Sequence, residues 1–370
     1  MKILLVSINS VYEQTGGGIY LRTLKSLYEM SGAEVDVFSK DSPDYKIRKN
    51  IFTDLMGRFL LCPSYIGTYF LKILSVSNKY DVIAFHSTRL GILAKMIKLF
   101  KVNKKIICHS DNVESSLIKE ININTGILKR ILIGVDSILI PYSESYSVKN
   151  CEMITFITEE DQKAIQNKMS FNVADKSFII PVLLNSSNLP SGQHGDYIFF
   201  SGSFDFYPNQ HALSRIITLA EKNINLKYCV SGRGLNKFIS EAKLTIPENL
   251  SIFSDVTSTK MAELYQNALL YLCPVKFGSG MKTKIAEALS HNLFVIADKD
   301  STYGYNDAVK KNVVYSVDSN FFESNDTEKL EDLIKVINTT KKNQAKKPYQ
   351  AFKELYSLEA GIESFRRNIL

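Results

Sequence analysis

One stretch decides the fold, and it reads Pro274-Val-Lys-Phe-Gly-Ser-Gly-Met-Lys-Thr-Lys-Ile-Ala-Glu-Ala-Leu-Ser290. An apolar run, Leu269–Cys273, precedes it and another, Leu293–Ala297, follows it. The order is therefore strand, glycine turn, helix and strand. Gly278 and Gly280 allow the backbone to approach a ligand, and the first N–H groups of the helix face outward at the same place.

The charged residues of this stretch are typical of a diphosphate site. Lys282 and Lys284 stand where the helix begins, and positive charge there adds to the free N–H groups in favouring an anion. Glu287 lies about one turn further on, within reach of a ribose hydroxyl. A bare Gly-x-Gly is also typical of an ordinary turn with solvent-facing lysines, so the interpretation depends on the rest of the chain.

Strands and helices alternate through both halves of the sequence, which implies two parallel, doubly wound sheets. The strands expected in the first half are Lys2–Ser7, Glu34–Ser39, Asp81–Phe85, Lys105–Cys108, Met153–Ile157 and Ser177–Pro181. Those expected in the second half are Tyr197–Ser201, Lys227–Val230, Leu250–Phe253, Leu269–Cys273 and Leu293–Ala297.

Composition sets the limits within which these motifs are interpreted. The chain has 370 residues, 45% hydrophobic and 22% charged, which is enough for two packed domains. Its net charge of +7 favours anionic partners without choosing among them. Five cysteines lack metal or disulfide spacing, so we expect reduced core residues. No apolar run reaches the roughly 20 residues needed to span a bilayer, and the first residues form a strand rather than a signal peptide.

The central stretch resembles the donor-binding signature of family 4 GT-B glycosyltransferases, in which a glycine turn precedes a lysine-bearing helix and Glu-Ala. Gly202-Ser-Phe-Asp-Phe-Tyr-Pro-Asn209 is similar to the Gly-x5-Pro-Asn turn that opens the donor domain in one branch of that family. Gly16-Gly17-Gly18 falls where the family has a glycine loop, and Asp111-Asn-Val-Glu114 resembles its His-Asn-Val-Glu turn. Several motifs in the expected order carry more weight than any one of them.

The resemblance covers nearly the whole chain and implies the GT-B architecture. This is an α/β fold with two Rossmann-like, doubly wound parallel-sheet domains that face a cleft. We expect an acceptor-binding domain over residues 1–187 and a nucleotide-sugar-binding domain over residues 195–345. A linker rich in Asn, Ser, Pro and Gly separates them, and a helix over residues 346–370 is expected to pack back on the first domain.

Site residues follow from the matched motifs. The catalytic residues implied are His86, Lys284 and Glu287. Acceptor-side contacts are expected from Asp111, Asn112 and Glu114. The donor-binding residues implied are Gly17, Gly18, Gly202, Ser203, Arg233, Val256, Gly278, Ser279, Gly280, Met281, Lys282 and Thr283.

Three positions depart from the family pattern or have a second interpretation. Ser279 stands where many members carry the first glutamate of Glu-x7-Glu, and Asp111 takes the place of a histidine. His86 follows a strand expected to end at the ligand-binding edge, yet a capping or packing histidine is also typical there. Asp298-Lys-Asp300 has the spacing of the Asp-x-Asp metal motif of another glycosyltransferase fold, but its place late in the second domain favours a plain acidic loop.

The resemblance implies a retaining, metal-independent transferase without a cofactor. Its donor is a nucleotide sugar, UDP- or GDP-linked, and its acceptor is a glycan or lipid-linked oligosaccharide in cell-surface polysaccharide or lipopolysaccharide assembly. Nucleic acid is not among the expected partners. Two alternatives stay open: a sugar-nucleotide 2-epimerase of the same fold, and a catalytically inactive subunit, the latter motivated by Ser279 and Asp111.

A membrane contact is a further hypothesis. Residues 46–76 combine basic and large apolar side chains, and a lysine-rich segment follows at Lys95, Lys98, Lys101, Lys104 and Lys105. In the family this region often meets lipid-linked acceptors, so we expect a cytoplasmic protein that docks on an anionic membrane surface. An amphipathic helix packed on its own sheet explains the same pattern equally well.

Overall fold

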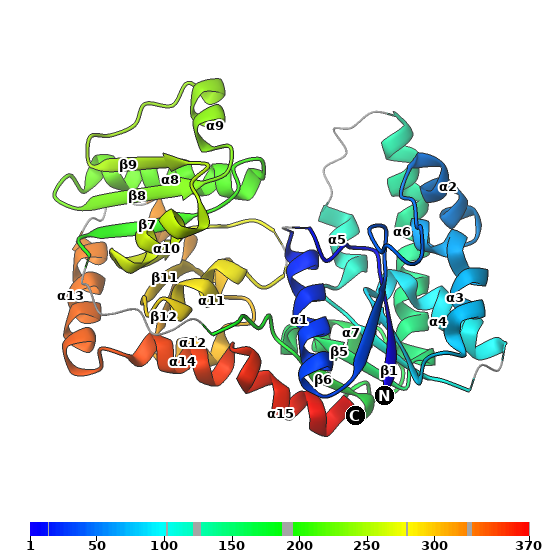
Figure 1. Ribbon diagram of the computed structural model, residues 1–370. Coiled ribbons are helices and arrows are strands. Elements are labelled where there is room, and N and C mark those ends of the chain that lie inside the picture. The colour runs from blue at the N-terminus through cyan, green and yellow to red at the C-terminus, as the bar shows by residue number, and fades with distance from the viewer. Residues whose placement is uncertain are drawn as a thin grey trace. The chain divides into compact units, whose positions relative to one another are not determined.

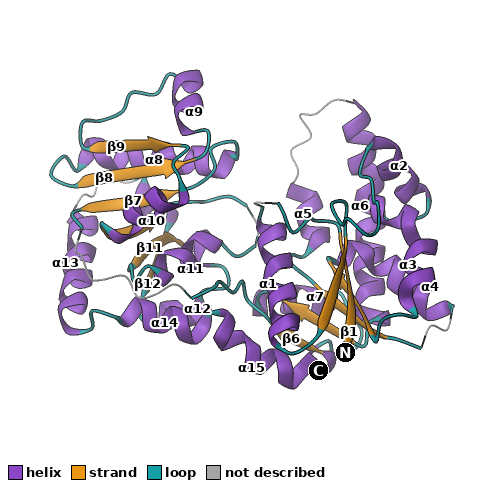
Figure 2. Cartoon of the chain, viewed as in Figure 1, coloured by secondary structure: helices purple, strands orange, loops and turns teal. Residues whose placement is uncertain are grey.

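The computed structural model describes residues 1–13, 15–100, 103–120, 127–186, 195–278, 280–323 and 328–369. The chain divides into two compact units. The first comprises Met1–Leu183 with Gly361–Leu370, and the second comprises Leu184–Ala360. Each unit is an α/β structure built on one parallel sheet (Figures 1 and 2).

The sheet of the first unit has the order β2-β1-β3-β4-β5-β6, with every neighbouring pair parallel. Its strands are β1 (Lys2–Ser7), β2 (Glu34–Phe38), β3 (Val82–His86), β4 (Lys105–His109), β5 (Met153–Phe156) and β6 (Ser177–Ile179). The order reverses between β1 and β3, so the loops after these strands diverge and leave a place for a ligand. The register aligns Ser7 with His86, and His86 with His109, at this edge.

Helices cover both faces of the first sheet, α1 on one and α4 and α6 on the other (Figure 1). Leu4, Val6 and Phe85 of the sheet pack in one apolar core with Leu93 and Ile97 of α4. The helices are α1 (Gly16–Met30), α2 (Ile51–Phe59), α3 (Phe70–Ser77), α4 (Gly91–Leu99), α5 (Glu114–Glu120), α6 (Ile127–Asn150) and α7 (Glu159–Gln166), with the short 3-10 helices η1 (Tyr65–Tyr69), η2 (Thr88–Leu90) and η3 (Ala174–Lys176).

The second unit repeats this topology with the order β12-β11-β10-β7-β8-β9, again entirely parallel. Its strands are β7 (Tyr197–Ser201), β8 (Lys227–Gly232), β9 (Leu250–Ser254), β10 (Ala268–Cys273), β11 (Val295–Asp298) and β12 (Val314–Val317). The reversal falls between β7 and β10. The sequence predicted the other strands well but missed β12, because an alternation of apolar and polar residues over four positions is too short to be recognised.

The helices of the second unit connect these strands and continue beyond the last one. They are α8 (Tyr207–Lys222), α9 (Leu235–Ala242), α10 (Ser258–Gln266), α11 (Thr283–Ser290), α12 (Asn306–Lys310), α13 (Glu328–Asn343) and α14 (Lys347–Leu355), with η4 (Lys299–Thr302) and η5 (Ser319–Phe322). The five cysteines, two of them in this unit, are buried and free, as predicted.

The C-terminal segment differs from the expected single helix over residues 346–370. It forms α14 and then α15 (Leu358–Ile369), with a break at Tyr356 and Ser357. The break coincides with a bridge to Leu184, whose N–H donates to the Tyr356 carbonyl and whose carbonyl accepts from the Leu358 N–H. Backbone hydrogen bonds to another segment thus interrupt the helical ladder.

The unit boundary passes through α15. Residues up to Ala360, which include α14, group with the second unit, whereas Gly361–Leu370 group with the first unit. There the Phe365 ring meets Tyr28 of α1 edge-on at 4.8 Å, and Lys105 donates to the Ile369 carbonyl at 2.6 Å. The cleft expected between the two halves stays a prediction.

Candidate active site

The glycine turn of the second unit lies where β10 ends and α11 begins. Gly278 and Gly280 adopt φ values of +94° and +75°, which only glycine adopts without strain. Lys282 is the N-cap residue of α11 and forms no side-chain cap. The Tyr305 hydroxyl donates to the Lys282 carbonyl at 2.7 Å and accepts from the Ala286 N–H at 3.2 Å, which holds the first turn in place. The start of a helix favours an anion, although two N–H groups of this first turn, those of Ile285 and Ala286, already donate to Lys282 and Tyr305.

The residues predicted for the turn differ in their burial and in their contacts. Ser279 lies outside the described residues. Met281 is buried and belongs to the packing, whereas Thr283 is half-buried at the first helical position. The Lys282 ammonium folds back to the Gly278 carbonyl and lies 3.3 Å from the Gly280 carbonyl oxygen. Its charge therefore sits on the turn itself.

Lys284 is directed into the unit and is half-buried. Its Nζ donates to Asn209 Oδ1 at 2.7 Å and lies 4.5 Å from the centre of the Phe200 ring. Burial, with a smaller contribution from the neighbouring Lys282, lowers the pKa of Lys284 to about 8, while Glu287 acts in the opposite direction. The positive charge of Lys284 is only partly balanced by its neighbours, so a bound anion would stabilise the charged form.

Glu287 lies one turn after Lys284 on α11. The Tyr265 hydroxyl donates to Glu287 Oε2 at 3.0 Å. Burial raises the pKa of Glu287, and the hydrogen bond from Tyr265 partly offsets this rise. Tyr265 is itself fixed, because its ring stacks on His291 at 4.6 Å and its hydroxyl lies 2.8 Å from Ser201 Oγ. The carboxylate is thus oriented by a rigid neighbour.

Asn209 joins the two glycine motifs of this unit. It belongs to the second motif, where a Cβ on Gly202 would lie 2.8 Å from the Asn209 side chain, so glycine is required there. Asn209 Nδ2 donates to the Ser203 carbonyl at 2.8 Å, while its Oδ1 accepts from Lys284. The sequence showed Asn209 as part of a motif, but its role as the link to Lys284 needed the structure.

The loops after β7, β8 and β9 form a second, exposed group. Arg233 Nε donates to Asp205 Oδ2 at 3.1 Å, and its Nη2 donates to Ser203 Oγ at 3.2 Å. Both partners of the Arg233–Asp205 ion pair are largely exposed. Asp255 accepts from the Gly234 N–H at 3.0 Å, and the next residue, Val256, is half-buried. These contacts keep Arg233 at the carboxyl edge of the sheet, near the loop that holds Gly202.

In the first unit, His86 and Asp111 lie together at the edge where β3 and β4 end. His86 is fully buried, and its Nδ1 lies 2.9 Å from Ser7 Oγ. Its Nε2 lies 3.6 Å from Asp111 Oδ2, too far for a hydrogen bond. Among the described residues, neither His86 Nε2 nor Asp111 Oδ1 has a hydrogen-bond partner. Two unsatisfied buried polar atoms at one place indicate a binding site for a polar group.

Burial shifts both groups toward their neutral forms. It lowers the pKa of His86 to about 4, opposed by the charge of Glu114. Burial also raises the pKa of Asp111 to about 6, which Arg89 partly offsets. At neutral pH the pair is therefore a neutral imidazole beside a carboxylate, a combination that accepts and donates hydrogen bonds to a hydroxyl.

The backbone next to His86 is strained. Ser87, directly after His86, has φ +90°, an unfavourable value for a residue with a side chain. Its hydroxyl donates to Glu114 Oε1 at 3.1 Å, and Arg89 donates to Glu114 Oε2 at 2.8 Å. Glu114 is thus held by two neighbours, whereas the carbonyl of the half-buried Asn112 accepts from Ser110 Oγ. No sequence motif indicated the roles of Ser87 and Arg89.

The glycine loop of the first unit is the first turn of α1. Thr15 caps the helix, since its Oγ1 accepts from the Gly18 N–H at 3.3 Å. A Cβ on Gly17 would meet the Asn9 side chain at 2.8 Å, and one on Gly18 the Glu13 carbonyl at 2.3 Å. Close packing therefore accounts for both glycines. Any contact of Gly17 and Gly18 with a donor stays a prediction.

Asp298 and Asp300 differ in surroundings. Asp298 is fully buried, accepts from Arg215 at 2.7 Å and from Ser319 at 2.8 Å, and binds the Asp300 N–H through Oδ1. Asp300 is exposed. Arg215 thus occupies the carboxylate that a metal ion would need. Within the described residues no group of three or more His, Cys, Asp or Glu side chains is arranged to hold a metal.

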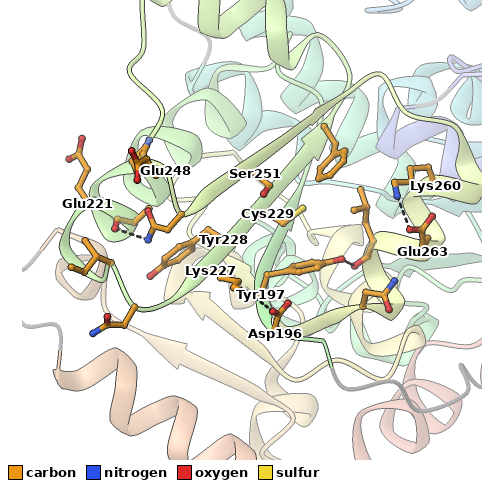
Figure 3. A pocket seen from close by; sticks show the side chains of 18 residues that line it. Asp196, Tyr197, Glu221, Lys227, Tyr228, Cys229, Glu248, Ser251, Lys260 and Glu263 are labelled. Atoms are coloured by element: carbon orange, nitrogen blue, oxygen red, sulfur yellow. Dashed lines mark hydrogen bonds and ion pairs between the residues drawn. The ribbon is translucent and has the colours of Figure 1, made fainter.

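A cavity of about 910 Å³ lies elsewhere in the second unit, at the amino ends of β7, β8 and β9 (Figure 3). Tyr197, Tyr228 and Phe253 line it, with the ion pairs Lys227–Asp196 and Lys260–Glu263 at its rim. Ligands of doubly wound sheets bind at the opposite, carboxyl edge. The cavity therefore does not belong to the candidate active site.

Comparison with known proteins agrees with this geometry. Residues 185–354 match the family described as glycosyl transferases, group 1. No curated protein matches the chain.

Solved structures are similar over nearly the whole chain. The sucrose-phosphate synthase of Thermosynechococcus elongatus is 13% identical, with 99% of this chain and 97% of that chain covered and a TM-score of 0.66. The catalytic domain of starch synthase IV from Arabidopsis thaliana, bound to ADP and acarbose, is 10% identical, with 99% and 98% covered and a TM-score of 0.65. HepE of Anabaena in complex with UDP is 12% identical, with 100% and 99% covered and a TM-score of 0.62. The expected GT-B fold with two Rossmann-like halves is confirmed.

Proposed function

We propose that the protein is a retaining, metal-independent glycosyltransferase that moves a sugar from a nucleoside diphosphate to a hydroxyl group of a glycan or lipid-linked acceptor. One observation carries the proposal. In the unit that matches the group 1 family, the Gly202 and Gly278 motifs converge through the Asn209–Lys284 hydrogen bond at the start of α11. The arrangement offers an anion backbone N–H groups and a partly buried ammonium together.

The chemistry assigned to these residues is stabilisation of the leaving group. When the bond between the sugar C1 and the diphosphate oxygen breaks, negative charge develops on the diphosphate. Lys284, Lys282 and the first turn of α11 stabilise that charge, and Glu287 accepts a hydrogen bond from the ribose. The acceptor oxygen bonds to C1 from the face the diphosphate leaves, so the configuration at C1 is retained, and the acceptor proton is taken up by the diphosphate.

Lysines and a helix start take the part that a divalent cation has in other transferases. The carboxylate with the spacing of a metal motif, Asp298, is neutralised by Arg215, which supports this assignment. The acceptor is assigned to the first unit, where His86 and Asp111 present unsatisfied polar atoms. A place in cell-surface polysaccharide assembly completes the proposal, on the strength of the motif resemblance.

The proposal is tested with a panel of UDP-, GDP-, ADP- and CMP-linked sugars. Binding is measured by calorimetry, and slow hydrolysis of the donor by nucleotide release, with and without EDTA. We expect one nucleoside diphosphate sugar to be bound and hydrolysed, with no loss in EDTA. Conversion of the donor sugar to its epimer without an acceptor would indicate the epimerase instead, and binding without any turnover would favour an inactive subunit.

The membrane contact is assigned to a surface formed by α2 and α6, which we call the α2/α6 surface. Its exposed apolar side chains are Ile51, Phe52, Leu55, Phe59, Ile131, Val135, Ile138 and Tyr142. The two helices are fixed side by side, because Arg58 binds Asp136 through two hydrogen bonds of 2.9 and 2.7 Å. Contiguous exposed apolar side chains of this kind are typical of interaction surfaces.

The expected lysine-rich segment contributes less than the sequence indicates. Lys98 and Lys105 donate to backbone carbonyl groups, Lys95 lies over the Tyr146 ring, and Lys101 lies outside the described residues. None of the helices described is long and apolar enough to cross a bilayer. We therefore propose peripheral docking on the inner face of the cell membrane through the α2/α6 surface.

Liposome flotation tests this docking. The wild type is expected to float with anionic liposomes, and Phe52→Ser with Phe59→Ser is expected to abolish flotation. Ile224→Ser, which changes an exposed apolar side chain of the second unit, is the matched control. A wild type that stays at the bottom of the gradient would rule the docking out.

A further inference from the structure

Three large aromatic side chains are exposed around the glycine turn of the second unit. Phe206, Tyr207 and Phe277 are 56%, 63% and 41% exposed. Tyr207 and Phe277 lie 6.0 Å apart between ring centres, with an angle of 31° between their planes. We call Phe206, Tyr207 and Phe277 the aromatic platform. Such rings are normally buried, so their exposure at one place indicates a binding role.

The platform is continuous with the turn assigned to the diphosphate. Phe277 directly precedes Gly278, and a Cβ on Gly278 would lie 3.8 Å from Phe206 Cζ and 3.7 Å from Pro208 Cγ. Phe206 and Phe277 therefore both lie next to the turn. A group stacked on them lies beside the bond that the proposed reaction breaks.

Polar groups accompany the rings. His211, on the first turns of α8, meets the Phe277 ring edge-on at 4.9 Å. Its Nδ1 is buried and has no hydrogen-bond partner among the described residues. Burial lowers the pKa of His211, and the charges of Arg215 and Lys276 lower it further, so the imidazole is neutral at pH 7. Lys276 and Glu323 form an ion pair of 3.7 Å close by.

We propose that the aromatic platform binds a pyranose ring of the acceptor glycan. This inference rests on the proposed function and deepens it, because it names a carbohydrate rather than a lipid chain as the group that the second unit recognises on the acceptor. A pyranose ring has an apolar C–H face that stacks on aromatic rings and a rim of hydroxyl groups that hydrogen-bond to polar neighbours. An alkyl chain would cover the rings but has no hydrogen-bonding group to offer to the imidazole of His211, which lies edge-on to Phe277 and has an unpartnered nitrogen among the described residues.

The exposure of the rings also favours the acceptor over the transferred sugar. A transferred sugar is bound tightly enough to be oriented for reaction, and such sites are concave and mostly buried. An acceptor glycan is longer than the part that reacts and approaches from solvent. Open aromatic surfaces suit a chain of sugar rings that must enter and leave in every turnover.

Saturation-transfer NMR on the full chain tests the proposal, with maltotriose and chitotriose as carbohydrate probes and hexanol as the apolar probe. We expect saturation of sugar ring protons in the wild type. Tyr207→Ala should reduce it about fivefold, because one aromatic stacking contact contributes about 1 kcal/mol. Tyr207→Phe keeps the ring and should retain the signal, as should the distant Ile224→Ala. Phe277→Leu is a second ring deletion, which preserves apolar contact should Tyr207→Ala fold poorly.

Each outcome decides the question. Loss of the sugar signal in the two ring deletions, with retention in both controls, supports the platform. No sugar signal in the wild type, equal signals in all variants, or loss of the hexanol signal alone would overturn it. Donor hydrolysis by the wild type is measured separately. Its absence beside intact glycan binding would contradict the proposed function and leave the platform standing.

Discussion

The carboxyl edges of the two sheets share a topology and differ in chemistry. Both lie at the reversal of a six-stranded parallel sheet within the described residues. The edge of the second unit carries a glycine turn with Lys282 and Lys284, whereas that of the first carries His86 and Asp111 with unsatisfied atoms. The fold indicates where a ligand binds, and the side chains determine which one; under the proposed function this is an anion in the second unit and a hydroxyl group in the first.

Two buried carboxylates, Asp298 and Asp111, also differ between the two units. Asp298 of the second unit is paired with Arg215 at 2.7 Å and with Ser319. Asp111 of the first unit has an unpartnered Oδ1 and a pKa raised to about 6 by burial. The pairing of Asp298 is explained by the fold, whereas the unpartnered oxygen of Asp111 has no such explanation and makes Asp111 a candidate for ligand binding.

The largest effect is expected from Asp298→Asn. Arg215 is 4% exposed, and the substitution removes its buried counterion and leaves the half-exposed Glu323, 2.6 Å away, as its remaining carboxylate partner, so the free energy of unfolding should fall by about 3 kcal/mol. Urea unfolding at pH 7 measures the change. Asp300→Asn, at an exposed position, is the control and should be neutral. A metal-dependent stabilisation of the wild type that Asp298→Asn removes would contradict the structural role.

Lys284→Ala should reduce donor hydrolysis by about 10² to 10³, the size found when one charge-stabilising donor is removed from an active site. Because burial lowers the pKa of Lys284 to about 8, donor affinity of the wild type should fall as the pH rises through 8 and the ammonium loses its proton. Nucleotide release and calorimetry across pH 6 to 10 measure both effects.

Lys284→Arg and Lys276→Ala serve as controls for this prediction. Arginine keeps its charge above pH 8, so the alkaline fall should disappear in Lys284→Arg even if activity is low. Lys276 is half-exposed and paired with Glu323, so its removal should change hydrolysis little. Equal losses of donor hydrolysis in Lys284→Ala and Lys276→Ala would show that positive charge in general, rather than a specific contact of Lys284, favours the donor.

Asp111→Asn should act in the opposite direction on stability. The folded state holds the pKa of Asp111 above its ordinary value of 3.8, so ionisation destabilises the fold as the pH rises from about 4 to above 6. Asparagine cannot ionise, and the variant should gain about 1 to 3 kcal/mol at pH 7 and nothing at pH 4. Transfer to the acceptor should fall. Urea unfolding at the two pH values measures the gain in the free energy of unfolding. A loss of stability at pH 7 would contradict the inference that the charge of Asp111 destabilises the fold.

Periodicity made most of the fold predictable. Apolar runs of four to six residues bounded by turn residues indicated the strands well, because parallel strands are buried on both faces. Besides the short strand β12, two features were missed for physical reasons. The break between α14 and α15 depends on a backbone bridge to Leu184, far away in sequence, and α6 contains Pro141, which argues against a helix locally.

The site was predictable to the extent that it rests on motifs. Gly278, Gly280, Lys284 and Glu287 follow one another closely, so their sequence spacing fixes their relative places on a turn and a helix. The partners that tune them come from elsewhere in the chain. Tyr265 meets Glu287 across 22 positions, and no local pattern distinguishes such a tyrosine from a core residue.

The smallest effect is expected from Tyr265→Phe, which removes the hydrogen bond to Glu287 and keeps the stacking on His291. Unfolding free energy should fall by about 1 kcal/mol. Because the hydrogen bond lowers the pKa of Glu287 against the rise from burial, its loss should raise that pKa, and the acid limb of donor binding should shift to higher pH. Tyr271→Phe is the matched control, since its hydroxyl contacts Ser201 without reaching Glu287 and the limb should not move. Tyr265→Phe could instead lose stability and leave the acid limb of donor binding unchanged. That result would mean that Glu287 does not need its charge to bind the donor, and that the second unit recognises the ribose by another group.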